Sequence, residues 1–99
     1  MRILVANVNT TASMTHAIGE SARSVASPGT EIIELTPDFG ADSCEGNFES
    51  YLAAIAVMDK VVRYEGEYDA VIQAGYGEHG REGLQELLNV PVVDITDAA

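Results

Sequence analysis

The sequence predicts an α/β domain in which helices cover both faces of a four-stranded parallel sheet, a three-layer α/β/α arrangement. Short apolar runs alternate along the chain with longer segments whose apolar residues recur every three or four positions. All 99 residues fit this alternation, which is the length of one small domain. Because parallel strands are joined by right-handed crossovers, few arrangements are open, and we expect the strand order 2-1-3-4.

The first third of the chain predicts two strands with a helix between them. Residues 3–6 form a continuous apolar run of strand type. Residues able to cap a helix follow, so the helix should begin near Thr11 or Ser13. Its predicted inner face consists of Met14, Ile18, Ala22 and Val25. Residues 27–30 end the helix, and residues 32–35 form the second strand.

The remainder predicts two helices and two strands. After a long loop over residues 37–46, Asn47 should cap a helix whose inner face is Phe48, Leu52, Ile55 and Val62. The largely apolar run at residues 70–74 is the third strand, and it ends in a glycine-rich loop. From Arg81 onward the chain predicts a helix with an apolar face of Leu84, Leu87 and Leu88. Residues 90–95 form the fourth strand.

Composition narrows the classes of function. Sixteen acidic and five scattered basic residues give a formal charge of −11, which disfavours nucleic acid and anionic membranes as partners. The chain starts directly with a strand rather than a leader and has no apolar run of membrane-spanning length. Its single cysteine, Cys44, forms no internal disulfide, so a cytoplasmic location is expected.

The predicted topology brings together two loops, one rich in asparagine and threonine and the other rich in glycine. In the order 2-1-3-4, the connections from strands one and three leave toward opposite faces, which opens a crevice at their carboxyl ends. Asn9, Thr10 and Thr11 would line one side, where helix-terminal amides favour a carboxylate or another anion. Residues 75–80, with glycines at 75, 77 and 80, would line the other. The alternatives are that the first group only caps a helix and that the glycines only make a tight turn.

Other side chains near this crevice have two interpretations each. Ser43 and Cys44 lie in the loop after the second strand, where Cys44 is either a nucleophile or an incidental thiol. His79 could act as acid or base, and Tyr76 could close over a ligand or pack on the third helix. His16 lies on the first helix beside Thr15, and for both histidines the alternative is a plain surface or capping role. The acidic residues do not converge on one loop, so we predict neither a metal site nor a two-carboxylate hydrolase.

The sequence resembles the amino-terminal half of the Asp/Glu/hydantoin racemase superfamily along essentially its whole length. The resemblance rests on the order and spacing of several short stretches: residues 1–5, 7–11, 13–15 with Ile18, 26–31, Ser43 with 45–46, 75–80 and 90–95. It implies two similar α/β lobes with the substrate between them and one cysteine from each lobe. It also implies cofactor-independent proton transfer at a carbon next to a carbonyl. Residues 1–99 would be a single lobe, half of such an enzyme.

This chain departs from the family pattern at one position that matters for chemistry. The amino-terminal cysteine of the family would fall at Gly75, so the first-lobe thiol is absent. We therefore expect a lobe that anchors a small carboxylate or cyclic amide, such as a hydantoin, through Asn9, Thr10, Thr11, Ser43, Gly75, Tyr76 and Gly77, and that is inactive alone. Its partner would be the missing second lobe or a further copy of the chain. Two alternatives remain open: a lyase of the arylmalonate decarboxylase type, and a non-catalytic binding or assembly module.

Overall fold

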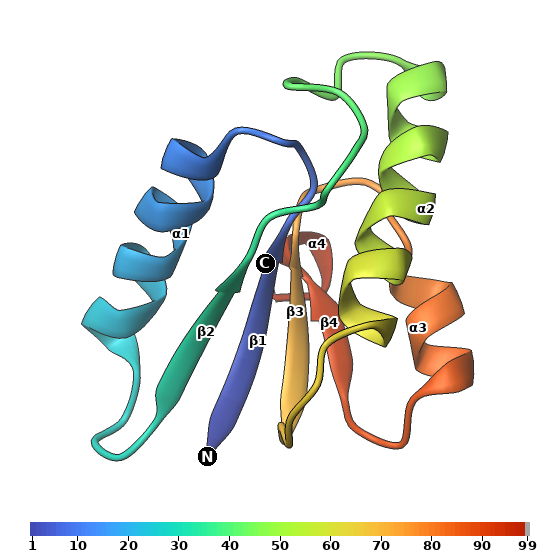
Figure 1. Ribbon diagram of the computed structural model, residues 1–99. Coiled ribbons are helices and arrows are strands. Elements are labelled where there is room, and N and C mark those ends of the chain that lie inside the picture. Colours follow the sequence, from blue (N-terminus) through green and yellow to red (C-terminus); the bar gives the residue numbers. More distant parts are fainter. Residues whose placement is uncertain (99) are drawn as a thin grey trace.

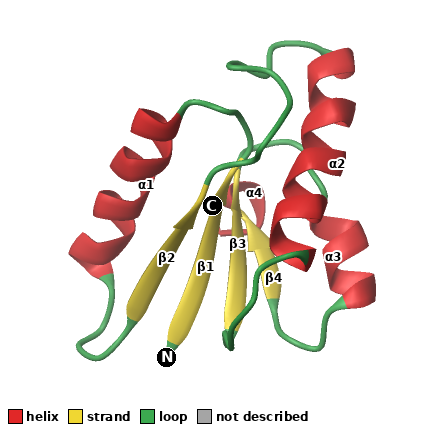
Figure 2. Cartoon of the chain, viewed as in Figure 1, coloured by secondary structure: helices red, strands yellow, loops and turns green. Residues whose placement is uncertain are grey.

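The computed structural model describes residues 1–98 and contains one parallel sheet of four strands in the order β2-β1-β3-β4. The chain alternates strand and helix throughout, as Figures 1 and 2 show. The bounds of the elements are β1 Arg2–Asn7, α1 Ala12–Val25, β2 Glu31–Leu35, α2 Asn47–Val62, β3 Ala70–Ala74, α3 Arg81–Leu87, β4 Val92–Asp94 and α4 Ile95–Ala98. The predicted fold class and strand order are confirmed.

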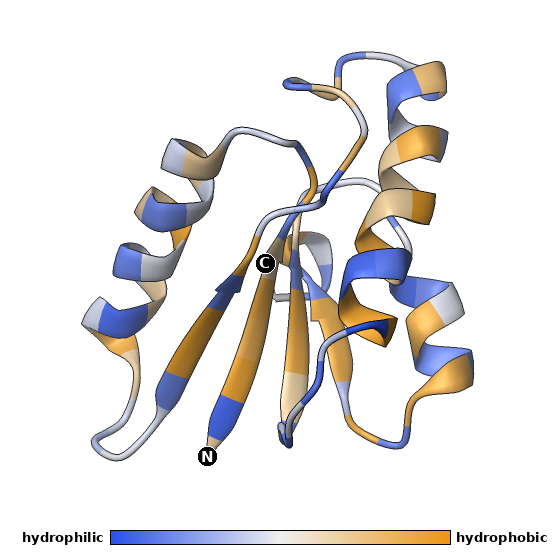
Figure 3. Ribbon diagram, in the orientation of Figure 1, coloured by the Kyte–Doolittle hydropathy of each residue, from blue (hydrophilic) through white to orange (hydrophobic). Residues whose placement is uncertain are grey.

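Two apolar layers lie between the sheet and its helices. One face of the sheet packs against α2 and α3 through a cluster that includes Leu4, Val57, Val71 and Leu84. The opposite face packs against α1 and α4 through a cluster that includes Val5 and Ile32. Figure 1 shows α1 on one side of the strands and α2 with α3 on the other, and Figure 3 shows the strands predominantly in the hydrophobic colour. Helices on both faces explain why the strands are apolar runs without alternation.

The inner faces of the helices differ from those predicted. On α2 the buried residues are Ala53, Ala56, Val57 and Val61. The predicted Phe48, Ile55 and Val62 are 76%, 57% and 52% exposed. Both sides of α2 are apolar, so periodicity alone cannot predict which side is buried. The small side chains of Ala53 and Ala56 on the buried side let the helix lie close to the sheet.

Similar corrections apply at other helices. On α1 the buried residues are Thr15 and Gly19, whereas the predicted Met14 and Val25 are exposed. On α3 Leu84 is fully buried but Leu87 is exposed. Because α3 and β4 are short, few positions along them face the core.

Helix and strand ends also refine the predictions. Thr11 is the N-cap residue of α1, as expected. The N-cap of α2 is Gly46, so Asn47 is the first helical residue rather than the cap. The fourth strand spans only residues 92–94, shorter than the predicted 90–95, because helix α4 begins at Ile95. Among residues 1–98, no helix is both long enough and apolar enough to cross a bilayer.

Candidate functional site at the carboxyl ends of the strands

A cavity of about 500 Å³ opens where β1 and β3 end side by side. In the sheet register Asn7 lies opposite Ala74, so the loops that follow the two strands start as neighbours. The loop between β2 and α2 completes the rim and crosses above the ends of the strands (Figure 1). The cavity is lined by Val8, Asn9, Ser43, Cys44, Glu45, Gly46, Asn47, Ser50, Gly75, Tyr76, Gly77 and His79. Five of the seven predicted binding residues are therefore together in one cavity.

The side chain of Asn7, the last residue of β1, holds the loop between β1 and α1 in place. Its side chain is 1% exposed, and its Nδ2 donates to Oδ1 of Asn9 at 2.8 Å and to Oγ1 of Thr15 at 3.0 Å. Nδ2 also lies 3.3 Å from the carbonyl oxygen of Thr11. These bonds join the end of the strand to the first turn of α1. Sequence reasoning missed this role because the partners of a buried amide depend on the tertiary structure.

Thr10 and Thr11 lie beside the cavity but outside its lining. The Thr10 amide donates to the carbonyl oxygen of Ala41 at 3.0 Å, and the Thr11 amide donates to Oδ1 of Asn9 at 3.0 Å. The prediction that these two amides are unpaired donors for an anion is therefore wrong. The Thr11 hydroxyl donates to the carbonyl oxygen of Asp42 at 3.2 Å, so both threonines tie the β2–α2 loop to the first loop.

Cys44 faces the cavity with a thiol that is not activated. Its Sγ lies 3.5 Å from the carbonyl oxygen of Val8, within range for S–H donation. Partial burial, together with the negative charge of Glu49, raises the pKa of the Cys44 thiol. A protonated thiol is a poor nucleophile. The interpretation of Cys44 as an incidental thiol fits this environment better than that of a nucleophile.

The glycine loop after β3 is packed over a buried polar pair, Gln73 and His79. A Cβ atom at Gly75 would lie 2.8 Å from both Nε2 of Gln73 and Cγ1 of Val8, and 3.0 Å from Nδ1 of His79. A Cβ atom at Gly77 would lie 2.8 Å from Cε1 of His79. Neither glycine has a positive φ, so space rather than backbone conformation requires them. His79 is 6% exposed, which corrects the interpretation of a plain surface histidine.

The rest of the loop is fixed to the start of α3 and to α4. The Glu78 carboxylate accepts from the Gly80 amide at 2.8 Å and from the Glu82 amide at 3.3 Å. The carbonyl oxygen of Tyr76 accepts a hydrogen bond from the hydroxyl of Thr96, while the Tyr76 ring is 75% exposed. The ring is therefore free to contact a guest and does not pack on α3.

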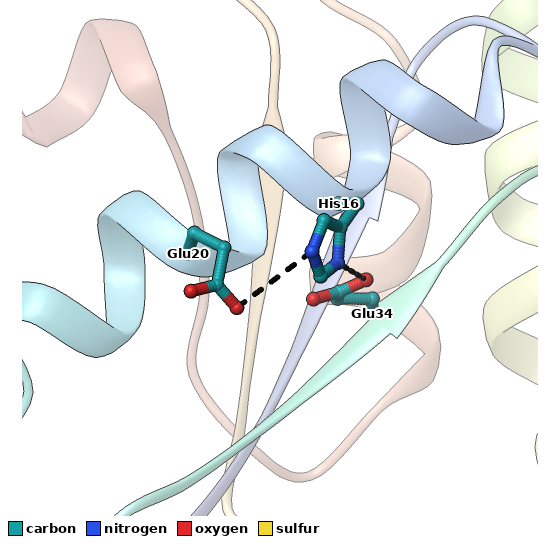
Figure 4. A group of neighbouring side chains, drawn as sticks. All are labelled: His16, Glu20 and Glu34. Atoms are coloured by element: carbon teal, nitrogen blue, oxygen red, sulfur yellow. Dashed lines mark ion pairs between the residues drawn. The ribbon is translucent and has the colours of Figure 1, made fainter.

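A second group of titratable side chains lies away from the cavity, between α1 and β2. His16, Glu20 and Glu34 place potential metal-ligand atoms within 4.8 Å of one another (Figure 4). Arg23 already pairs with both carboxylates, lying 3.0 Å from Glu20 and 2.5 Å from Glu34. The hydrogen bond from Arg23 lowers the pKa of Glu34 below its ordinary value. We interpret this group as an ion-pair cluster that joins α1 to β2.

Residues 3–99 match the family model described as Asp/Glu/Hydantoin racemase. The chain belongs to this racemase family. A solved allantoin racemase from Pseudomonas fluorescens is 80% identical and superposes with a TM-score of 0.98. An allantoin racemase from Klebsiella pneumoniae is 39% identical with a TM-score of 0.93, and a hydantoin racemase from Paenarthrobacter aurescens is 36% identical over 101 residues.

The chain spans about two fifths of the length of these racemases. It covers 42% of the Pseudomonas fluorescens chain, 40% of the Klebsiella pneumoniae chain and 43% of the Paenarthrobacter aurescens protein, while 99% or more of its own residues are matched in each case. The α/β domain described above thus matches only part of each of these longer racemases.

Proposed function

We propose that this chain is the substrate-anchoring amino-terminal lobe of a racemase that inverts a stereocentre next to a carbonyl group in cyclic amides such as hydantoins. The observation that carries the proposal is the shared cavity of the Asn9 segment and the glycine loop, in a chain of this family. The names of the similar racemases support the substrate class.

The chemistry explains why such a lobe would be shaped in this way. Racemisation by proton transfer needs a base on one face of the stereocentre and an acid on the other. It also needs hydrogen-bond donors aimed at the oxygen that becomes negative. Within residues 1–98, the amides of Tyr76 and Gly77 donate to no other part of the chain, and both residues line the cavity. We assign them to the developing oxyanion.

The remaining predicted residues receive different roles in this proposal. Asn9 and Ser43 contact the guest from the rim, and Thr10 and Thr11 position the rim through their contacts with the β2–α2 loop. Gly75 has no ionisable side chain, so a proton-transferring group on this lobe must belong to another residue. In the glycine loop Glu78 and His79 have such groups. In this proposal the second lobe supplies the opposite wall of the substrate site. The reaction needs no cofactor and takes place in the cytoplasm.

The test compares residues 1–99 with the longer polypeptide that includes the second lobe, using optically pure hydantoins and allantoin as substrates. We expect loss of optical rotation and solvent deuterium incorporation only with the longer polypeptide, because one wall cannot both remove and return the proton. Turnover by residues 1–99 alone would contradict the requirement for a second lobe. Decarboxylation of a disubstituted malonate without racemisation would instead favour the lyase, which no similar protein reported above supports.

A further inference from the structure

The imidazole of His79 lies at the wall of the cavity and supports the glycine loop. It is buried beneath Gly75 and Gly77, both of which lack the Cβ atom that would collide with its ring. Gly77 lies over the ring edge, where an added Cβ atom would be 3.5 Å from Nε2. The loop and the histidine therefore fit each other, and Gly77 separates the ring from the exposed part of the cavity.

The neighbours of His79 define which ring nitrogen carries the hydrogen. Nδ1 lies 3.1 Å from the carbonyl oxygen of Gly77, which can only accept. Nε2 of Gln73 lies farther away, 3.5 Å from Nδ1, and donates one of its two hydrogens to the carbonyl oxygen of Gly75 at 3.2 Å. In the neutral ring, Nδ1 is therefore the donor, and Nε2 presents a lone pair. That Nε2 is buried and has no hydrogen-bond partner among residues 1–98.

The charge of the cavity wall limits the kind of guest that fits. The lining residues include Glu45 but neither lysine nor arginine. A guest carboxylate would find no cation there and would be repelled by Glu45. It would also present only lone pairs to the lone pair of Nε2. A neutral cyclic amide is not repelled by Glu45, and its ring N–H group can donate to the lone pair of Nε2.

We propose that Nε2 of His79 accepts a hydrogen bond from a ring N–H group of a neutral cyclic amide and that this contact makes the cavity selective for cyclic amides over simple carboxylate anions. This inference rests on the proposed function and adds a specificity-determining residue to it. This contact requires the exposed Gly77 to move off the edge of the His79 ring.

Imidazole nitrogen NMR on the chain labelled with ¹⁵N-histidine tests the proposal. Before any guest is added, we expect the Nδ1–H tautomer at residue 79. Saturation with hydantoin should then shift the Nε2 resonance of His79, whereas 1,3-dimethylhydantoin, which has no N–H group, should leave it in place. His16, exposed on α1, is the internal control and should not respond to either compound.

A variant gives a second measurement. His79→Phe keeps a planar ring but has no acceptor, so its affinity for hydantoin should fall by about tenfold or more, whereas that for 1,3-dimethylhydantoin should be unchanged. An Nε2–H tautomer in the free chain would overturn the proposal. The proposal would also be overturned if hydantoin shifted the amide resonances of Ser43 and Gly77 but left the Nε2 resonance of His79 in place. That result would leave the proposed function intact. No response at the cavity to hydantoin would contradict both.

Discussion

Replacing Gly80 with alanine is expected to lower the free energy of unfolding by about 2–4 kcal/mol. Gly80 has a φ of +100°, a conformation that side chains rarely adopt. An added Cβ atom would also lie 3.0 Å from the carbonyl oxygen of Ala54 and 2.9 Å from Cγ of Met58. Because the Ala54 oxygen belongs to the backbone of α2, the contact cannot be relieved by rotating a side chain. Urea unfolding followed by circular dichroism measures the loss.

Gly29→Ala is the matched control for this prediction. Gly29 also has a positive φ, +88°, but an added Cβ atom would meet nothing within 4 Å. Its substitution should cost only the backbone strain, about 1–2 kcal/mol. Equal losses for the two variants would show that α2 and the glycine loop are not packed as closely as described.

Asn7→Asp is expected to lower the free energy of unfolding by about 3 kcal/mol or more, although the side chain keeps its shape. The Asn7 amide nitrogen faces three oxygens, those of Asn9, Thr11 and Thr15. A buried carboxylate at this position would turn two of these contacts into repulsion, because Oδ1 of Asn9 and the carbonyl oxygen of Thr11 accept only. Chemical denaturation near neutral pH measures the change.

Asn89→Asp provides the comparison, because Asn89 is exposed at the opposite end of the sheet from the cavity. That substitution should change stability by no more than about 0.5 kcal/mol. If Asn7→Asp were equally mild, the amide of Asn7 would not be the group that holds the first loop against α1.

The alternation of apolar runs and periodic helices was sufficient to predict the sheet and its order, because right-handed crossovers leave few topologies. It was insufficient for the inner faces of helices. On α2, Phe48 and Ile55 are as apolar as Ala53 and Val57, and only the distance between helix and sheet decides which side is buried.

At the candidate site, too, the topology could be predicted from the sequence, whereas contacts between residues distant in the chain could not. The two loops were predicted to meet because that follows from topology. The pairing of the Thr10 amide with Ala41 and the burial of Gln73 and His79 were not predicted, since these contacts join residues brought together by the fold. The close fit of Gly75 and Gly77 around His79 is likewise visible only in three dimensions.

The most direct test of the central claim is a map of the amide resonances of the ¹⁵N-labelled chain during titration with hydantoin. If the carboxyl ends of β1 and β3 form the binding site, the shifts should concentrate at Asn9, Ser43 and residues 75–77. A second cavity, of about 340 Å³ and lined by Arg2, Gly29 and Asp69, lies at the amino ends of the strands and should remain unaffected. Shifts confined to that amino-terminal cavity would contradict the account.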